Sequence, residues 1–386
     1  MVLSSQLQLS RLPINRDRLL NIIDTLHTHI FGEQNSFSTE MDEQNKLARD
    51  YFVSQAKALN LKVEIDSIGN IKATRKGTKD LPPVAIGGHL DASSYQQVHG
   101  GSLSLSMGLE IIKVLNENNT TTKRPISIIS FTNTEGKRFT PNLLGSLVYS
   151  NAVPLEEMLC VASKDTPKVT LSKELKKKKY LGKVHYKYKP LHSFVEIQTE
   201  AFINKEDSKI GLIEGIYGTY WTEYHLAENQ NITQEEIQKS LLKISKQYEG
   251  LASSFEPVFH HKNLFLLDLK HYDARVLNSA QISFDNFLQE KLTASVLKTI
   301  RKESVRLAPI PFEEGIVEVI ENIANNMNLK LPTALSYKAV NAQIMIEKNH
   351  VASIYVPCLS KNHQSIINIE NGTKLLLHSV LELTKT

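Results

Sequence analysis

Two side chains that could hold a metal ion stand two residues apart after a short apolar run. His89 and Asp91 follow Val84–Ile86, and a glycine-rich turn then leads into a helical pattern. Imidazole and carboxylate groups are common zinc ligands. A second ligand is expected in the turn, but residues 92–101 contain no carboxylate. The motif therefore indicates either a working metal centre or the remains of one.

Apolar segments around this motif predict the elements that position it. Val84–Ile86 and Pro125–Phe131 are short and rich in strand-forming residues, and helical spacing runs from Leu103 to Asn116 between them. Strand, helix and strand in this order form a βαβ unit with parallel strands. Ser193–Glu200 predicts another buried strand, and residues 61–77 predict a hairpin. We expect an α/β fold with a mixed, mainly parallel sheet.

The pattern changes near residue 214. An alternating strand segment at 215–228 is followed by a helix at 233–249, a strand at 263–272 and a second long helix over 284–303. This order predicts an α+β domain inserted into an α/β domain, in preference to two domains in tandem. The expected boundaries are 1–213 with 327–386 for the α/β domain, and 214–326 for the inserted domain.

The composition is that of an ordinary globular chain. Its 386 residues are 41% hydrophobic and 22% charged, with a formal net charge of +4. Two cysteines, Cys160 and Cys358, predict no disulfide framework, and we expect them to be inert buried thiols. No apolar run reaches the ~20 residues that span a bilayer, and the first residues lack a secretory signal pattern. We expect a cytoplasmic protein without a membrane partner.

One charge run, Lys173–Lys189, interleaves lysines with tyrosines. Such a run could bind an anionic partner, and it also fits a solvated helix face followed by a loop. We favour the solvated helix and expect no nucleic-acid partner, because the mild net charge gives no independent support for one.

Six segments carry a resemblance to a known family through their order and spacing. They are residues 42–73, 87–93, 108–115, 124–139, 143–146 and 194–200. In these the chain resembles the hydantoinase/carbamoylase amidase family, which includes N-carbamoyl-amino-acid hydrolases and allantoate amidohydrolases. The resemblance covers nearly the whole chain. It implies a zinc-peptidase-like α/β domain with an inserted α+β lid and dimerisation domain.

The resemblance also implies a site with two divalent ions that activate a water molecule against a C–N bond. Such a site needs a carboxylate bridging the ions and another that accepts the proton of the water. By the family's pattern His89 is the first metal ligand, and Asp91 is the residue that orients it. Gly100 stands where the bridging aspartate belongs, and the neighbouring His99 would reach the site only if the turn slips by one residue.

The rest of the family's pattern is kept only in part. Two adjacent glutamates serve there as general base and metal ligand, but this chain has Thr134 and then Glu135. Gln198 stands at the position of a histidine ligand, with Glu200 retained after it. In the loop near the C-terminus, Tyr337 aligns with the last histidine ligand. The resemblance thus implies that His89 and Glu135 remain as ligands and that the base is lost.

On the substrate side, Lys270 stands near the position of an arginine that pairs with the substrate carboxylate in the family. His363 matches a histidine in a loop close to the family's site. A family segment that carries a histidine across the dimer has no counterpart after the strand at 215–228. The resemblance still implies a homodimer through the inserted domain.

Two functions remain open from the sequence. The first is a non-hydrolytic relative that keeps the fold, binds a small-molecule or protein ligand, and carries no cofactor. The second is a hydrolase of N-carbamoyl amino acids or similar ureido substrates, with one zinc or manganese ion held by His89, Glu135 and a third group from His99, Gln198 or His363. We favour the first, because losing the bridge, the base and two histidines removes the nucleophile and the oxyanion stabilisation together.

Overall fold

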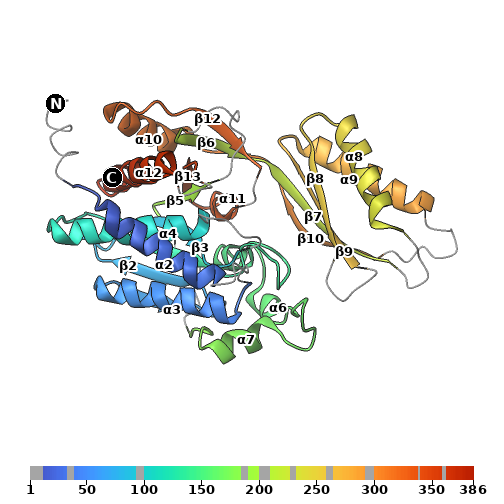
Figure 1. Cartoon of the computed structure of the whole chain (residues 1–386), viewed down its shortest axis with the longest axis horizontal. Coiled ribbons are helices and arrows are strands. Elements are labelled where there is room, and N and C mark those ends of the chain that lie inside the picture. The colour runs from blue at the N-terminus through green and yellow to red at the C-terminus, as the bar shows by residue number, and fades with distance from the viewer. Residues whose placement is uncertain are drawn as a thin grey trace.

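The protein has a larger and a smaller lobe, each built on its own β-sheet (Figure 1). The computed structural model describes residues 12–32, 39–92, 100–183, 190–199, 209–226, 232–257, 264–291, 300–337, 340–358 and 362–386. The larger lobe contains a nine-stranded sheet and the smaller lobe a four-stranded sheet.

The larger sheet has a parallel centre and antiparallel edges. Its strands are β1 (Lys62–Ile65), β2 (Ile71–Arg75), β3 (Val84–His89), β4 (Ile126–Phe131), β5 (Ser193–Gln198), β6 (Gly211–Ile216), β11 (Ile310–Pro311), β12 (Thr333–Ser336) and β13 (His350–Tyr355). Their order is β1-β2-β4-β3-β5-β13-β6-β11, with β12 also paired to β6. The neighbours β4, β3, β5 and β13 run parallel. The predicted α/β fold is confirmed, and β1 and β2 form the predicted hairpin.

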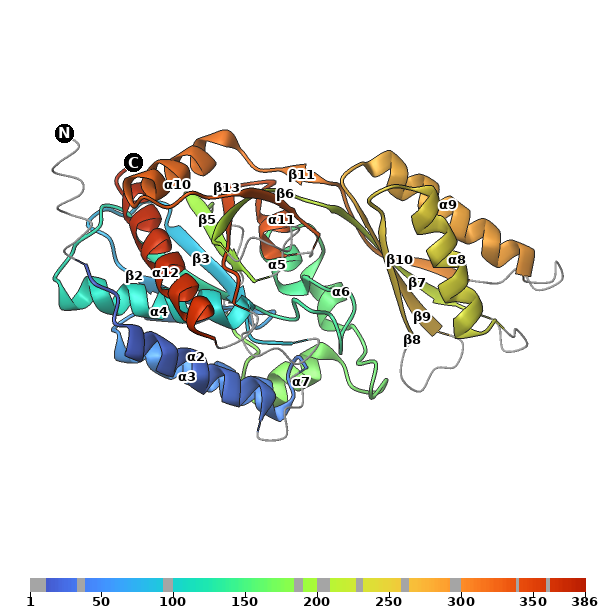
Figure 2. The same ribbon diagram turned by 45° about the horizontal axis from the view of Figure 1, so that its top comes forward.

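Helices cover both faces of this sheet (Figure 2). They are α2 (Arg16–Phe31), α3 (Glu43–Ala58), α4 (Gly100–Glu117), α5 (Leu144–Tyr149), α6 (Leu155–Leu159), α7 (Leu171–Lys178), α10 (Glu314–Asn326), α11 (Asn341–Met345) and α12 (His363–Leu383). The main apolar core joins one face of the sheet to α2, α3, α4, α10 and α12. A smaller core joins the other face to α5 and α11.

Helix α4 crosses very close to the sheet, which fixes the start of the helix beside the end of β3. A Cβ on Gly88 would overlap the carbonyl of Gly101, and one on Gly108 would lie 3.1 Å from Ile128. On its outer side, Glu110 of α4 accepts a hydrogen bond from Arg18 of α2 at 2.6 Å. Because Glu110 is fully buried, this ion pair holds α2 firmly against α4.

The smaller lobe is a four-stranded antiparallel sheet with two helices on one face (Figure 1). It comprises β7 (Gly218–His225), β8 (Ala252–Pro257), β9 (Leu264–His271), β10 (Ile300–Leu307), α8 (Gln234–Gln247) and α9 (Ala274–Lys291), with strand order β10-β7-β9-β8. Alternate apolar residues of β7 and β9, such as Tyr224 and Leu267, pack under α8 and α9. The other face brings Trp221 and Leu266 against Leu143 and Leu147 of the larger lobe.

One expectation about this region differs from the structure in part. The predicted helix over 284–303 holds only as far as Lys291, where α9 ends, because residues 300–307 form β10. Pairing of β10 with β7, far away in the sequence, overrides the local helical pattern there. Helix α10, which the expected insertion of 214–326 includes, packs in the main core of the larger lobe. Among the described residues, no helix is long and apolar enough to cross a membrane.

Candidate functional site

The candidate site lies at the carboxyl end of β3, where parallel strands of an α/β sheet commonly present functional side chains. His89 is the last residue of β3 and is buried. Its imidazole lies against the first turn of α4, so closely that a Cβ on Gly101 would overlap the ring. Glycine at position 101 is therefore needed for α4 to begin beside this histidine.

Asp91 ties the end of β3 to the loop that follows β4. Its carboxylate accepts hydrogen bonds from the backbone N–H groups of Thr134, at 3.3 Å, and Glu135, at 2.8 Å. The Nδ1 atom of His89 lies 3.0 Å from the carbonyl of Asp91 and 3.3 Å from its Oδ1. These acceptors favour a proton on Nδ1, which leaves Nε2 facing Glu135, whose Oε1 is 3.8 Å away.

A buried ion pair that the sequence reasoning missed supports the same loop. Arg49 donates a hydrogen bond to Glu40 at 2.6 Å, and both side chains are buried. The other oxygen of Glu40 accepts a hydrogen bond from the backbone N–H of Asn133 at 2.8 Å. The pKa of the Glu40 carboxyl is raised to about 7. Burial is the main cause, Arg49 opposes it, and the charge of Asp91 adds to it. The pair thus fixes the backbone just before Thr134 and Glu135.

Thr134, at the expected general-base position, is buried and bound into a neutral contact. Its hydroxyl donates to the side-chain oxygen of Asn341 at 3.3 Å. Asn341 in turn donates to the carboxylate of Glu196 at 2.9 Å, and the backbone N–H of Ala342 donates to the other oxygen of Glu196 at 2.9 Å. A buried carboxylate on β5 therefore holds the start of α11 beside Thr134.

Gln198, at an expected histidine position, points to β12. Its side-chain oxygen accepts a hydrogen bond from the hydroxyl of Ser336. Its Nε2 atom is buried and has no hydrogen-bond partner. The amide therefore supplies a donor to this region, and a donor does not coordinate a cation.

Gly100 begins α4 next to the end of β5. A Cβ placed on Gly100 would lie 3.0 Å from the hydroxyl of Thr199. Any side chain at this position would therefore require a small shift of Thr199. The structure brings Gly100 and Gly101 to His89 and to the end of β5, as the alignment with the family's turn expects, but neither glycine supplies a ligand.

The remaining predicted residues are dispersed or lie outside the described residues. Glu200 and His99 belong to segments that are not described. His363 is the exposed first residue of α12. Lys270 lies on β9 with its ammonium group 2.8 Å from Asp268. By strand alternation Lys270 shares the face of Leu266, which is turned toward the larger lobe.

Tyr337 lies within the described residues, directly after β12, and its place at the last ligand position stays a prediction. Asn341, four residues further on, contacts Thr134. The sequence analysis did not single out Asn341.

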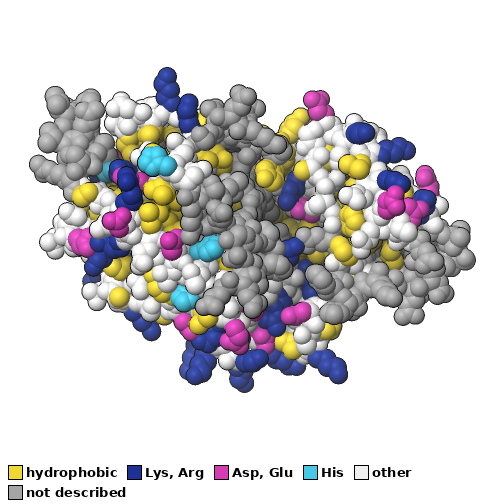
Figure 3. Space-filling view, in the orientation of Figure 1, with side chains coloured by type: hydrophobic (Ala, Val, Ile, Leu, Met, Phe, Trp, Pro, Cys, Tyr) yellow, Lys and Arg dark blue, Asp and Glu magenta, His cyan; other side chains and the backbone are white. Residues whose placement is uncertain are grey.

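The two cysteines and the basic run lie apart from this site. Cys358 is buried as expected, which raises its thiol pKa, but the expected burial is wrong for Cys160, which is exposed. Figure 3 shows lysine and arginine side chains along the lower edge of the molecule, where α7 lies, with acidic side chains among them. One lysine of α7, Lys178, is buried and paired with Glu43. The described part of the run is thus a helix face of mixed charge.

The donors among the described residues do not by themselves make a site for a pair of metal ions. Within the described ranges, no group of three or more His, Cys, Asp or Glu side chains is arranged to hold a metal ion. His89 and Glu135 face each other, while the carboxylate of Asp91 is engaged by two backbone N–H groups. Two dications need a shared carboxylate, and Gly100 cannot provide one.

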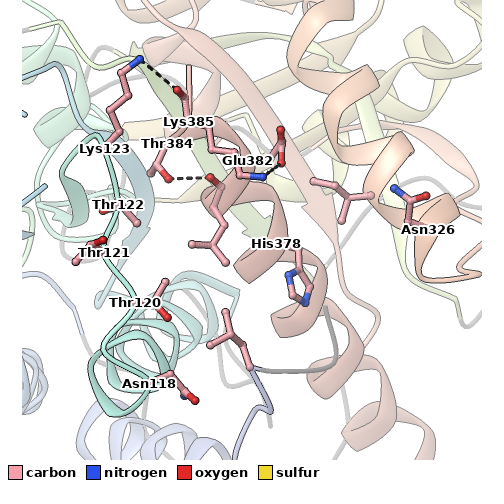
Figure 4. Close-up of a pocket in the computed structure, with 13 residues that line it drawn as sticks. Asn118, Thr120, Thr121, Thr122, Lys123, Asn326, His378, Glu382, Thr384 and Lys385 are labelled. Carbon is pink, nitrogen blue, oxygen red and sulfur yellow. Dashed lines mark hydrogen bonds and ion pairs between the residues drawn. The ribbon is translucent and has the colours of Figure 1, made fainter. Parts of the chain in front are cut away.

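A cavity of about 520 Å³ lies elsewhere in the larger lobe. Figure 4 shows Thr120, Lys123, His378 and Glu382 around it. These residues precede β4 or lie on α12, so the cavity is near the amino ends of the parallel strands, opposite His89. Burial lowers the pKa of His378 to about 4. The ammonium group of Lys123 is already bound to the carbonyls of Lys385 and Thr386.

Comparisons with known proteins give a consistent class. No family model matches the chain. The chain is 24% identical to an N-carbamoyl-L-amino-acid amidohydrolase of Rhizobium meliloti over 86% of its own length and 88% of that protein. It is 22% identical to a ureidoglycolate hydrolase of Arabidopsis thaliana over 97% of its own length and 88% of that protein. Both relatives are C–N hydrolases by name.

Solved structures give the same fold. An amidase of the hydantoinase/carbamoylase family from Burkholderia vietnamiensis superposes with a TM-score of 0.86 at 21% identity, covering 97% of this chain and 98% of that one. The chain thus has the two-lobed α/β fold of the hydantoinase/carbamoylase amidases over nearly its whole length. In sequence it is similar to N-carbamoyl-L-amino-acid amidohydrolases and ureidoglycolate hydrolases, as the resemblance in its sequence predicted.

Proposed function

We propose that this protein is a non-hydrolytic member of its family, which keeps the two-lobed fold and uses the former active-site cleft to bind a small-molecule or protein ligand. The observation that carries the proposal is the pair Gly100 and Thr134, which stand where the bridging aspartate and the general base belong. Glycine has no side-chain atom that could coordinate a metal ion, and the hydroxyl of Thr134 donates a hydrogen bond to Asn341. Neither residue can accept the proton of a nucleophilic water near neutral pH.

The contacts of the loop before α11 support a change in the alignment. If Val340–Asn341–Ala342 replaces the family's His-Asp-Ala, the last ligand position is Val340, not Tyr337. Val340 is buried in an apolar cluster with Phe312 and Met345. On this alignment three ligand positions, at Gly100, Gln198 and Val340, carry no group that binds zinc well.

A second candidate function is favoured by the relatives. They are hydrolases of N-carbamoyl amino acids and of ureidoglycolate by name, so a ureido compound is the substrate class that this candidate predicts. His89 and Glu135, whose Nε2 and Oε1 atoms lie 3.8 Å apart, could then hold a single zinc or manganese ion with a third ligand from His99, Gln198 or His363. Under this candidate, Lys270 would face the substrate carboxylate.

Metal content and turnover separate the two functions. The protein would be purified without chelator, analysed by mass spectrometry for zinc and manganese, and assayed with N-carbamoyl amino acids, ureidoglycolate and allantoate. The first proposal expects less than about 0.1 metal ion per chain and no ammonia release above buffer. Turnover that is abolished by both His89→Ala and Glu135→Ala would establish the second candidate instead.

We also propose that the chain forms a homodimer through its smaller lobe. Leu242 on α8 and Ile282 on α9 are each 58% exposed, on helices whose inner faces pack against the four-stranded sheet. Large apolar side chains exposed on an outer helix face favour a protein contact.

A further inference from the structure

Two chains of hydrogen bonds run from the candidate site to the segments that join the lobes. In the first, the hydroxyl of Ser336 donates to Gln198, and the carbonyl of Ser336 accepts the backbone N–H of Tyr217 at 2.8 Å. Tyr217 is the single residue between β6 of the larger lobe and β7 of the smaller lobe. The residue at a former ligand position is therefore two hydrogen bonds away from one inter-lobe connection.

The second chain reaches both connections through α11. Glu196 accepts hydrogen bonds from Asn341 and from the backbone of Ala342, both at 2.9 Å. The next residue, Gln343, donates from Nε2 to the carbonyl of Tyr217 at 3.1 Å and to the carbonyl of Ala308 at 3.3 Å. Ala308 lies between β10 of the smaller lobe and β11 of the larger lobe. One side-chain amide thus joins the outgoing and the returning strand connections.

The side chains that form these hydrogen bonds are buried, although Ala308 itself is exposed. Ser336 and Asn341 have no exposed surface, and Gln343 is 1% exposed. Breaking such a bond leaves a buried polar group unpaired, which is costly. Beside them, Trp221 of the smaller lobe packs with Leu143 and Ile344 of the larger lobe. A hinge needs backbone that is able to change its dihedral angles, and here both connecting segments are pinned.

We propose that Ser336 and Gln343 are positioning residues that fix the smaller lobe at one orientation relative to the larger lobe. The neutral groups Gln198 and Asn341 belong to this brace of hydrogen bonds. In this protein the smaller lobe then does not rotate over the candidate site at the end of β3. The inference builds on the proposed loss of the hydrolytic site, but its test needs neither metal nor substrate, so the two can fail separately.

Pulsed electron–electron resonance would measure the distance between the lobes in the full-length chain. Cys160 is replaced by serine, and spin labels are placed at Lys57→Cys on α3 and Lys239→Cys on α8. Both lysines are exposed. In this background the proposal expects a single narrow distance distribution.

Variants then remove the brace in two ways. Gln343→Met keeps the side-chain length but loses both hydrogen bonds. Ser336→Ala removes the hydroxyl contact with Gln198 and keeps the backbone hydrogen bond to Tyr217. The matched control is Gln364→Met, because Gln364 is exposed on α12 and bonds only to Asn368 among the described contacts.

The width of the distribution is expected to at least double in Gln343→Met, to increase less in Ser336→Ala, and to stay unchanged in the control. An unchanged width in folded Gln343→Met would overturn the proposal, as would a broad distribution in the unmodified background. If Gln343→Met does not fold, Ser336→Ala decides alone by the same criterion.

Discussion

The carboxylate of Asp91 accepts a hydrogen bond from the backbone N–H of Glu135 at 2.8 Å. This contact joins the end of β3 to the loop after β4, and it aims the side chain of Glu135 at His89. The residues that the resemblance assigns to a metal site, His89 and Glu135, are thus also held by a structural joint between two parallel strands.

Asp91→Ala should therefore destabilise the fold whether or not a metal binds. It leaves the buried N–H groups of Thr134 and Glu135 without their acceptor, which costs roughly 2–3 kcal/mol of unfolding free energy. Urea unfolding followed by circular dichroism measures this change. Asp80→Ala, at an exposed position, should stay within about 0.5 kcal/mol of the unmodified protein. Equal effects of the two variants would contradict the role given to Asp91.

Restoring the missing ligands should restore metal binding. We expect the combined variant Gly100→Asp, Thr134→Glu, Gln198→His and Val340→His to bind zinc at micromolar concentration or tighter, measured by calorimetry. The same variant with Tyr337→His in place of Val340→His tests the alignment of the last ligand, and it should bind at least tenfold more weakly.

The new side chain at position 100 must displace the hydroxyl of Thr199 slightly, so a version that adds Thr199→Gly provides the structural control. If the combined variant with Val340→His and the one with Tyr337→His bind zinc equally, the realignment to Val340 is refuted. If the unmodified chain binds as tightly as they do, the proposed loss of the metal site is refuted.

The Glu40 carboxyl should make stability fall as the pH rises through the weakly acidic range. Its pKa is about 7 in the folded protein against an ordinary value of 4.5, so the folded state holds this proton more tightly than the unfolded state. The resulting stabilisation is complete below pH 4.5 and is lost as the pH approaches 7.

Glu40→Gln has no proton to lose. The unfolding free energy of the unmodified protein relative to this variant should therefore drop by about 2–3 kcal/mol between pH 4.5 and 7.5. Urea titrations at several pH values measure it. Asp66, whose pKa burial also raises to about 7, is present in both proteins, so its contribution cancels. A constant difference would show that Arg49 keeps Glu40 ionised throughout.

Gly87→Ala should be strongly destabilising, because a Cβ there would overlap the ring of Phe194 between β3 and β5. Overpacking of this kind costs roughly 1–3 kcal/mol or more. Gly315→Ala is the matched control, since its Cβ would meet nothing within 4 Å. In helix α10 it should stabilise by about 0.5–1 kcal/mol through helix propensity. Thermal unfolding of both variants measures the contrast, and similar shifts would refute the close packing.

Leu242→Glu combined with Ile282→Glu should convert a dimer into a monomer, because two charges would then have to be buried in the proposed contact. Light scattering at micromolar concentration gives the mass, and circular dichroism confirms that the variant is folded. Val153→Glu is not a suitable comparison, because Val153 packs against the inter-lobe cluster. Leu47→Glu, at a site 47% exposed on α3 of the other lobe, is the control. A monomeric unmodified chain would remove the dimer proposal.

Much of the structure of the larger lobe could be predicted from local sequence patterns. Apolar periodicity predicted β3, β4, the helix between them and the hairpin of β1 and β2. These features depend on residues close in sequence, so the local pattern is sufficient to predict them. The resemblance to the amidase family then predicted the fold as a whole, because the order of several short segments is more specific than any one of them.

What the sequence determined by itself was the resemblance to the hydantoinase/carbamoylase amidases, the α/β framework and the absence of acidic side chains at Gly100 and Thr134. Only the tertiary structure decided that residues 300–307 form a strand, that Asn341 contacts Thr134, and that Arg49 and Glu40 support the loop from beneath. Each of these depends on partners far apart along the chain. Their pairing is set by how strands and helices pack in space, which local residue types do not encode.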